Sequence, residues 1–344
     1  MPRRHLFLCP DGKKASGGVA VIYDTAAKIH EMGYDVAIMH LSSKAGYPHS
    51  ANPPLVYDQE WGRYETKNVS RLGYLRRRFN YLKDRLVPGP LPKVDLRPSD
   101  VIVVPDFMLS AALAAYPYQQ IGLFIQNTFA AQRQISLINA VDLKRIKWAL
   151  GVSDICMQQI DLLGLKNGYY LPASMHPHNF IYQKNKEKLI TYMPRKRPDE
   201  ARYIHKVLEQ RGNLKGYKLK PLDNMPLHEV SDALGRSRFF ISLQKHESIG
   251  FPAAEAMASG AIVVGYTGLG GREYFTSDTG IPVTEDDSSA LILTLESAIS
   301  EYETNSARLD ALRLSASLHI NRHFNNDRFN KAIEKIWKDI NMCS

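Results

Sequence analysis

Residues 238–271 read RFFISLQKHESIGFPAAEAMASGAIVVGYTGLGG, and this stretch decides the fold. Its first part, 239–243, is a short apolar and aromatic run, typical of a strand covered on both faces. Pro252 fits a first helical position, where its missing N–H group would have no partner anyway. Residues 253–258 are strong helix formers, and 261–265 reads as a second buried strand. The stretch therefore predicts strand, polar loop, short helix and strand, as in a parallel α/β sheet.

The start of the predicted helix offers backbone donors for an anion. The N–H groups of Gly250, Phe251 and Ala253 would be free and would face out at the carboxyl end of a strand. A phosphate binds at such a place, held by these donors and by the positive helix end. Glu255 lies about one turn inside the helix, so its carboxylate can accept from sugar hydroxyls at the same mouth. Glu247, separated from Glu255 by seven residues, is placed to contact whatever follows the phosphate.

This pattern resembles the E-x7-E signature of retaining glycosyltransferases with the GT-B fold, in the large family four of that classification. The likeness includes S-x-G-F-P, E-A-M-A-S-G and V-V-G-x-x-G. In that family the first glutamate lies beside the transferred sugar and the second holds the ribose, which implies these roles for Glu247 and Glu255. The family's intervening residues offer backbone N–H groups to the diphosphate, which implies donor contacts from Ser248, Ile249, Gly250 and Phe251. The alternative is an ordinary strand–helix–strand unit with two surface glutamates.

The resemblance implies an α/β protein with two Rossmann-like domains facing each other across a cleft. Strand and helix patterns alternate along the chain, and 344 residues are too many for one compact core. The pattern breaks and restarts near 171–174. We expect an N-terminal domain at 1–171 on the acceptor side and a C-terminal domain at 172–325 on the donor side. A last helix, within 326–344, should cross back to the first domain.

The other expected elements follow from apolar runs and helical periodicity. Further strands are expected at 5–9, 36–40, 101–105, 121–125, 149–153, 188–193 and 217–220. Helices are expected at 17–32, 199–210, 227–234 and 288–303, then one ending near 323 and one at 326–340. Residues 42–63 carry Gly, Pro, Ser and Asn without periodicity and are expected to form a long loop.

Composition narrows the class of protein. Charged residues make up 23% and hydrophobic residues 44%, as in ordinary globular proteins. Three widely spaced cysteines favour a reducing compartment over a disulfide framework. No segment has the length of a signal-peptide core or a membrane span, so we expect a cytoplasmic protein. A formal net charge of +9 favours anionic partners, and no nucleic-acid-reading motif is present, so we expect no nucleic-acid partner.

A glycine-rich loop follows the first expected strand. The sequence CPDGKKASGGV is not G-x-G-x-x-G, so a dinucleotide-binding reading loses its main support. It resembles the G-G-V loop of family-four enzymes, in which glycines let the backbone approach the diphosphate and the sugar. Gly17 and Gly18, which lack a Cβ atom, are therefore candidate donor contacts. A plain glycine turn is the alternative.

A basic turn follows the first strand of the second domain. Family members carry an arginine and a lysine in this region, and both neutralise the diphosphate. The resemblance assigns these roles to Arg195 and Lys196, with Arg197 or Lys245 as alternatives for the lysine. Two fixed cations make chemical sense, because the leaving group gains negative charge as the glycosidic bond breaks. A solvated basic turn is the alternative.

The acceptor side is less defined by the sequence. Asp106 and the pair Gln126 and Asn127 follow two expected strands, at the edge where ligands bind in open α/β sheets. They are the candidate acceptor contacts. Many family members place a histidine in this region, and no equivalent is recognisable here.

The resemblance implies transfer of a sugar from a nucleotide sugar to a glycan or lipid-linked hydroxyl, with retention of configuration. It implies no cofactor and no metal. The nucleotide diphosphate would leave from the face that the acceptor attacks, and its phosphate oxygen would help to deprotonate the acceptor. The alternatives are a nucleotide-sugar epimerase or phosphorylase of the same fold and a non-catalytic sugar-nucleotide-binding protein.

Residues 71–86 predict a basic amphipathic helix. Its apolar side chains share one face, with arginines and lysines around them. Such a helix could rest on an anionic membrane, as in peripheral enzymes that glycosylate lipid-linked acceptors. We favour the alternative that the face is buried against the first domain, with the basic residues solvated or recognising a charged acceptor.

Overall fold

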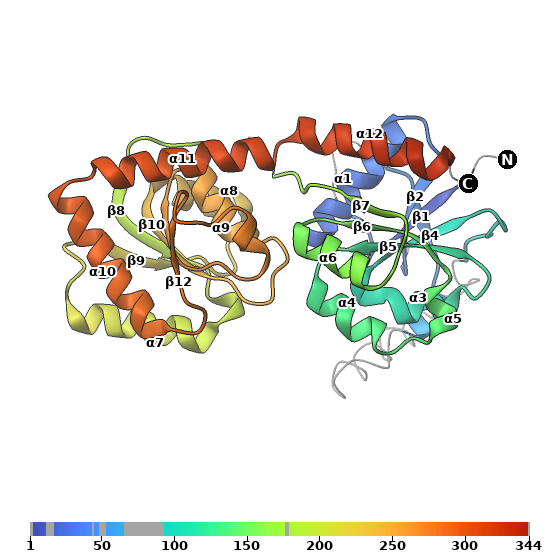
Figure 1. Cartoon of the computed structure of the whole chain (residues 1–344), viewed down its shortest axis with the longest axis horizontal. Coiled ribbons are helices and arrows are strands. Elements are labelled where there is room, and N and C mark those ends of the chain that lie inside the picture. The colour runs from blue at the N-terminus through green and yellow to red at the C-terminus, as the bar shows by residue number, and fades with distance from the viewer. Residues whose placement is uncertain are drawn as a thin grey trace. The chain divides into compact units, whose positions relative to one another are not determined.

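The computed structural model describes residues 3–11, 17–42, 45–47, 53–64, 93–175 and 179–342. The chain divides into two compact units, coloured along the sequence in Figure 1. Unit 1 comprises Met1–Val152, Cys156–Leu171 and Asn330–Ser344. Unit 2 comprises Ser153–Ile155 and Pro172–Phe329. The predicted basic helix at 71–86 lies outside the described residues.

Unit 1 is built on a parallel sheet whose described strands have the order β3-β2-β1-β4-β5-β6-β7. The strands are β1 (His5–Leu8), β2 (Val36–His40), β3 (Leu55–Tyr57), β4 (Val101–Pro105), β5 (Gln120–Ile125), β6 (Ile146–Gly151) and β7 (Gly168–Tyr170). The helices are α1 (Gly17–Glu31), α3 (Leu109–Ala115), α4 (Thr128–Ile135), α5 (Ala140–Leu143) and α6 (Asp154–Leu162), with 3-10 turns η1 (Trp61–Arg63) and η3 (Asp106–Met108). Because the strand order reverses between β1 and β4, ligands are expected at the carboxyl ends of these strands.

The end of the chain completes the core of unit 1. Helix α12 spans Asn326–Met342, and its Trp337 side chain is buried. The ring centroid of Trp337 lies 5.9 Å from that of Phe7, 5.8 Å from that of Trp148 and 5.1 Å from that of His5. Burial lowers the pKa of His5 to about 4, so the imidazole is neutral in this apolar setting. Helix α12 therefore covers β1 and β6 with aromatic surface.

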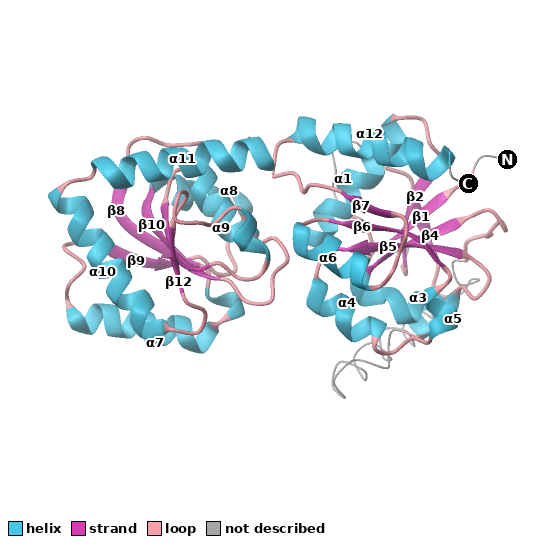
Figure 2. Cartoon of the chain, in the orientation of Figure 1, coloured by secondary structure: helices cyan, strands magenta, loops and turns pink. Residues whose placement is uncertain are grey.

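Unit 2 is built on a second parallel sheet, whose described strands have the order β12-β11-β10-β8-β9. The strands are β8 (Glu187–Tyr192), β9 (Lys218–Pro221), β10 (Ser237–Leu243), β11 (Ile262–Tyr266) and β12 (Ile281–Val283). The helices are α7 (Pro198–Arg211), α8 (Leu227–Arg236), α9 (Phe251–Ala258), α10 (Ser288–Thr304) and α11 (Ala307–His323), with 3-10 turns η4 (Pro194–Lys196) and η5 (Gly270–Glu273). Figure 2 shows the strands of each unit flanked by helices. Ile190, Phe239, Ile241 and Val264 are buried in the core because helices cover the sheet.

The sequence patterns locate most strands and helices within a few residues, but the predicted long loop at 42–63 is wrong in part. It contains strand β3. Strands β7 and β12 and the unit 1 helices α3, α4, α5 and α6 were also not predicted. Each of these three strands has only three residues, and none of those residues is fully buried. Short edge strands need no continuous apolar run, which is the signal that marks buried strands. Strand β6 begins earlier than predicted because the exposed Lys147 interrupts its apolar run.

Candidate functional site

The loop between β10 and α9 presents backbone donors at the carboxyl edge of the unit 2 sheet. Gly250 precedes the helix with φ 80° and ψ 51°, a left-handed conformation that favours glycine. A Cβ atom there would lie 1.8 Å from Oε1 of Gln244, so the space also demands glycine. Within the described residues, no hydrogen bond uses the backbone N–H groups of Ile249, Gly250 or Phe251. These donors and the helix end can bind an anion, as the sequence pattern predicts.

One expected donor is not free. The N–H group of Ala253 donates to the carbonyl of Gly250 at 3.2 Å, because the first helical turn closes on itself. The prediction of a free N–H group at Ala253 is therefore wrong. Ser248 is buried, and a Cβ atom on Gly270 would lie 2.0 Å from its carbonyl oxygen. The loop thus packs closely on the glycine-rich segment that follows β11.

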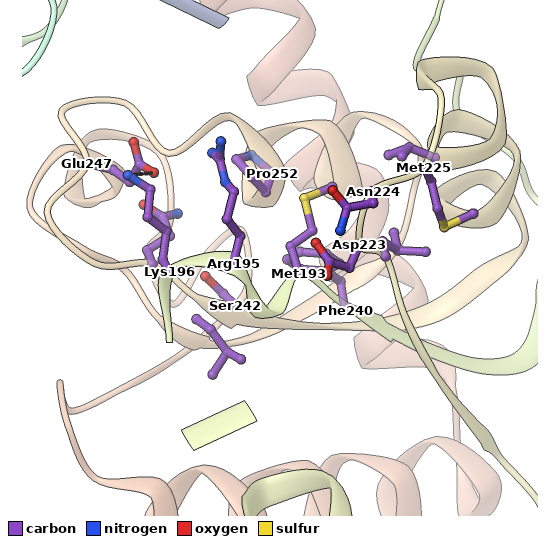
Figure 3. A pocket seen from close by; sticks show the side chains of 14 residues that line it. Met193, Arg195, Lys196, Asp223, Asn224, Met225, Phe240, Ser242, Glu247 and Pro252 are labelled. Atoms are coloured by element: carbon purple, nitrogen blue, oxygen red, sulfur yellow. Dashed lines mark ion pairs between the residues drawn. The ribbon is translucent and has the colours of Figure 1, made fainter. Parts of the chain in front are cut away.

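A cavity of about 220 Å³ opens beside this loop, within unit 2 (Figure 3). Its lining comes from the carboxyl ends of β8, β9 and β10 and from the start of α9. Arg195 and Lys196 lie toward one end with Glu247, and Asn224 and Met225 lie toward the other. The structure therefore brings together Glu247, Arg195 and Lys196, the three residues that the family resemblance implies for catalysis.

An ion pair joins two of these residues. Nζ of Lys196 lies 2.9 Å from Oε1 of Glu247, and the two side chains are 38% and 22% exposed. A pair this accessible to water contributes about 0–1 kcal/mol. An incoming anion can therefore replace Glu247 as the partner of Lys196 at little cost in free energy. Lys245, an alternative to Lys196 from the sequence, does not line the cavity.

Glu255 is half-buried on α9 and does not line this cavity. Burial raises the pKa of its carboxyl group to about 7. Within the described part of the chain, its side chain has no hydrogen-bond donor and no cation beside it to offset that burial. A carboxylate in this state gains from any hydroxyl donor that a ligand supplies.

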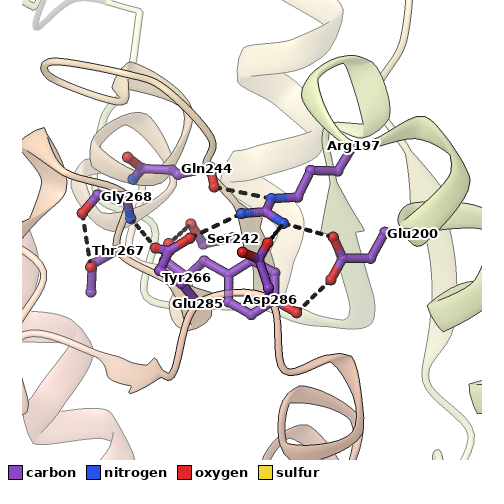
Figure 4. Close-up of polar contacts among 9 residues, drawn as sticks. All are labelled: Arg197, Glu200, Ser242, Gln244, Tyr266, Thr267, Gly268, Glu285 and Asp286. Carbon is purple, nitrogen blue, oxygen red and sulfur yellow. Dashed lines mark hydrogen bonds and ion pairs between the residues drawn. The ribbon is translucent and has the colours of Figure 1, made fainter. Parts of the chain in front are cut away.

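The neighbouring Arg197 has a structural role (Figure 4). Its buried guanidinium donates to the carbonyl of Gln244 at 3.2 Å, to Glu200 and Glu285 at 2.9 Å each, and to Asp286. It also stacks on the ring of Tyr266, 4.7 Å from the centroid. Four of its five N–H donors are engaged within unit 2, which favours a structural role for Arg197 over binding of the diphosphate. Arg197 instead ties the basic turn to the end of β10 and to residues 285–286.

Gln244, which sequence reasoning missed, organises the loops beneath the cavity. Its Nε2 group donates to the hydroxyl of Tyr274 at 3.0 Å, and that hydroxyl donates to the carbonyl of Gly250 at 2.6 Å. Cβ atoms on Gly268 or Gly271 would lie 2.9 Å or 3.1 Å from the Gln244 amide. The run T-G-L-G-G after β11 was the available signal, since closely spaced glycines indicate close approach of other groups.

In unit 1, two candidate acceptor contacts serve their own backbone. Asp106 is buried, and its Oδ2 accepts from the N–H groups of Gln126 at 2.6 Å and Asn127 at 2.7 Å. Burial raises the pKa of Asp106 to about 6. The side chain of Asn127 caps α4 by accepting from the N–H groups of Phe129 and Ala130. Both side chains hold the turn between β5 and α4 in shape.

Gln126 and the glycine pair lie together. A Cβ atom on Gly18 would lie 2.5 Å from Oε1 of Gln126, so glycine permits this contact. Nε2 of Gln126 is buried without a hydrogen-bond partner among the described residues. Gly17 is the first residue of α1, while residues 12–16 of the loop are outside the described residues.

A hydrogen-bonded chain at the same edge of unit 1 was not predicted. The hydroxyl of Tyr23 accepts from the N–H group of Tyr47 at 3.1 Å and lies 2.8 Å from Nε2 of His40. Nδ1 of His40 lies 3.3 Å from Oδ1 of Asp11. The aspartate also accepts from the N–H group of Leu41 at 3.0 Å. This chain fixes the ends of β1 and β2.

Comparisons with known proteins establish the fold. No protein-family model matches the chain, and no curated protein matches it. The structure is similar to sucrose-phosphate synthase from Thermosynechococcus elongatus, with a TM-score of 0.65 and 12% identity over 100% of both chains. It is similar to HepE of Anabaena in complex with UDP and glucose, with a TM-score of 0.65 and 12% identity over 98% of this chain and 99% of that one. A glycosyltransferase from Rickettsia africae gives a TM-score of 0.58 and 13% identity over 98% of each chain.

These similarities confirm the prediction of an α/β protein with the GT-B fold and two Rossmann-like sheets. None of the described helices is both long and apolar enough to span a membrane. Within the described ranges, His, Cys, Asp and Glu residues form no group of three or more that could hold a metal ion.

Proposed function

We propose that the protein is a retaining, metal-independent glycosyltransferase that moves a sugar from a nucleotide-diphosphate sugar to a hydroxyl acceptor. The observation that carries this proposal is the cavity in unit 2. There Arg195, Lys196 and Glu247 meet beside the start of α9, where the N–H groups of residues 249–251 make no hydrogen bond within the described part of the chain. The GT-B fold, shared with HepE in complex with UDP and glucose, supports the same function.

The diphosphate binds at the basic end of the cavity. The N–H groups of Ile249, Gly250 and Phe251 offer hydrogen bonds to its oxygens, while Arg195 and Lys196 offer positive charge. When Lys196 turns to the phosphate, it releases the carboxylate of Glu247 from their ion pair. The same event that binds the donor therefore frees the carboxylate that faces the sugar.

The leaving group gains negative charge as its bond to the sugar breaks, so fixed cations at this end stabilise the transition state more than the ground state. In the mechanism that we propose, the acceptor attacks from the face that the diphosphate leaves, and a phosphate oxygen takes the acceptor's proton. Glu247 supports the positive charge that develops on the sugar. Glu255 accepts from the ribose hydroxyls, which satisfies a carboxylate that has no partner in the described structure.

The acceptor binds unit 1, and a glycan or a lipid-linked glycan fits the implied chemistry. Gln126 beside Gly18 is the first candidate for contact, because its amide nitrogen is buried without a partner among the described residues. A cytoplasmic location is part of this proposal. Peripheral membrane contact through 71–86, the alternative to a buried helix face, is tested by liposome flotation with and without anionic lipid. Absence of binding at low salt rules out the membrane contact.

The test is a panel of UDP-, GDP-, ADP- and dTDP-sugars, with release of the nucleoside diphosphate measured before and after chelation of divalent ions. A transferase releases the nucleoside diphosphate from at least one donor, and chelation leaves this rate unchanged. The anomeric configuration of the product, determined by NMR, is that of the donor. Isomerisation of the sugar without release indicates the epimerase alternative. If nucleotide sugars bind tightly but no nucleoside diphosphate is released with any of a range of acceptors, the non-catalytic alternative holds and the proposal is overturned.

A further inference from the structure

We propose that the nucleotide base of the donor is guanine, recognised by the adjacent side chains of Asp223 and Asn224. The inference rests on the proposed function and deepens it. HepE was observed with UDP, so the proposal separates this chain from that structural neighbour. Residues 223–225 line the end of the cavity away from the phosphate-binding groups.

The cavity has a polarity that matches a nucleoside diphosphate. Arg195 and Lys196 lie toward one end, and Asn224 lies toward the other (Figure 3). Apolar side chains, including Phe240 and Val230, also line the cavity. A nucleoside diphosphate likewise has its charges at one end and a flat, largely apolar base at the other. With the diphosphate beside the two cations, the base reaches toward residues 223–225.

The loop that carries Asp223 and Asn224 is held in place by its backbone. It follows β9, and the N–H group of Leu222 donates to the carbonyl of Tyr192 at 2.8 Å. Asn224 has φ 53°, in the left-handed region that asparagine adopts more readily than most residues. In the described structure, neither the Asp223 carboxylate nor the Asn224 amide has a hydrogen-bond or ion-pair partner. Both residues are exposed and line the cavity, so their side chains are accessible to a ligand that enters it.

The two side chains together complement one base edge. A carboxylate offers two acceptors, and an amide adds N–H donors. Guanine presents two adjacent donors, on N1 and N2, followed by the O6 acceptor. The carboxylate of Asp223 can accept from both donors while the amide of Asn224 donates to O6.

The other bases fit this pair less well. Uracil presents a single N–H group between two carbonyl oxygens, so one oxygen of the Asp223 carboxylate would face a carbonyl oxygen. Cytosine presents one amino donor beside two acceptors. Adenine presents an amino donor beside a ring acceptor, which leaves the second carboxylate oxygen without a donor. The chemistry of the pair therefore predicts that GDP binds more tightly than ADP, CDP or UDP.

The experiment is calorimetric titration of the full chain with GDP, ADP, UDP and CDP at one salt concentration. We expect GDP to bind at least about tenfold more tightly than UDP, since guanine makes one more hydrogen bond to the charged carboxylate. Asp223→Asn should weaken GDP about tenfold and leave UDP unchanged or tighter, because the new amide can pair with uracil. Asp278→Asn, an equal charge change at an exposed residue that does not line the cavity, should alter no affinity.

The outcomes separate the two proposals. If no nucleoside diphosphate binds, the proposed function fails and the base assignment fails with it. If UDP binds as tightly as GDP, or if Asp223→Asn leaves the ratio of the two affinities unchanged, the guanine assignment fails while the proposed function stands. A denaturation midpoint for Asp223→Asn equal to that of the unmodified chain establishes that the variant is folded.

Discussion

The carboxyl edges of the two sheets use their polar residues in opposite ways. In unit 2, Lys196 and Glu247 stand at the surface in one weak ion pair, while the buried Arg197 beneath them binds four groups. In unit 1, Asp106 and Asn127 turn inward and satisfy their own backbone. The difference shows that a polar residue at the carboxyl end of a strand is not necessarily a ligand contact. What matters is whether its hydrogen-bonding groups remain available.

The largest effect on stability is expected when the buried Arg197 at the carboxyl edge of the unit 2 sheet is removed. Arg197→Ala leaves Glu200 and Glu285 beside an empty site and should lower the free energy of unfolding by about 3–5 kcal/mol. Urea denaturation measures this change. Arg202→Ala, on the same helix but in an exposed ion pair with Asp199, should stay within about 0.5 kcal/mol. Equal losses in the two variants would contradict a special role for Arg197.

The next largest effect concerns chemistry at the same edge. Glu247→Gln keeps the shape of the side chain but removes its charge, and kcat should fall about 10²–10³-fold. Initial rates of nucleoside diphosphate release measure it, at saturating donor. Glu229→Gln, an exposed glutamate on α8, provides the matched control and should keep its full rate. A fully active Glu247→Gln enzyme would remove this residue from the mechanism.

A glycine pair separates the cost of backbone conformation from the cost of crowding. Gly250 and Gly212 have φ values of 80° and 68°, but a Cβ atom meets nothing within 4 Å at Gly212 and lies 1.8 Å from Oε1 of Gln244 at Gly250. Gly212→Ala should therefore cost about 1–2 kcal/mol of stability. Gly250→Ala should cost about 1–3 kcal/mol more, because Gln244 must move. Thermal denaturation of the two variants gives the difference, and no difference would mean that the loop adapts freely.

A substitution of Asp106 tests whether the polar residues at the carboxyl edge of the unit 1 sheet are structural. The Asp106 pKa of about 6 exceeds the ordinary value, so the folded protein binds this proton more tightly than the unfolded chain does. The stability that this proton confers is present at low pH and is lost as the pH rises from about 4 to 6. Asp106→Asn should abolish this loss and be more stable at pH 7 by roughly 1–3 kcal/mol. Its kcat should change less than about fivefold, because the amide oxygen can still accept both N–H groups. A collapse of kcat in a folded variant would show that this edge also does chemistry.

The smallest effect is expected from Glu255. Its pKa of about 7 in the free protein means that the carboxyl group must lose a proton before it can accept from ribose hydroxyls as a carboxylate. Donor affinity should therefore rise with pH, by at most about tenfold per unit, and level off above about pH 7. Titration calorimetry in two buffers of different ionisation enthalpy detects the released proton. The dependence should vanish in Glu255→Gln, and its persistence there would assign it to another group.

The sequence predicted what depends on local pattern. Buried strands such as β4 and β10 are continuous apolar runs, and the loop before α9 is specified by Gly250 and Pro252 together. The three-residue strands β3, β7 and β12 escaped because half-buried edge positions carry no such run. Arg195, Lys196 and Arg197 have different roles although they are adjacent. These roles depend on how buried each side chain is and on partners that are distant in the sequence. No pattern within residues 195–197 distinguishes the exposed cation from the buried one.

The packing of Trp337 against Phe7 and Trp148 has a consequence for biosynthesis. The ribosome makes β1 and β6 before most of unit 2 and α12 after it, so the aromatic face of these strands stays uncovered while unit 2 is translated. The described strands of unit 2 are all synthesised before α12, whereas the core of unit 1 must wait for α12 itself. A nascent chain arrested before Asn330 should therefore display this face to chaperones.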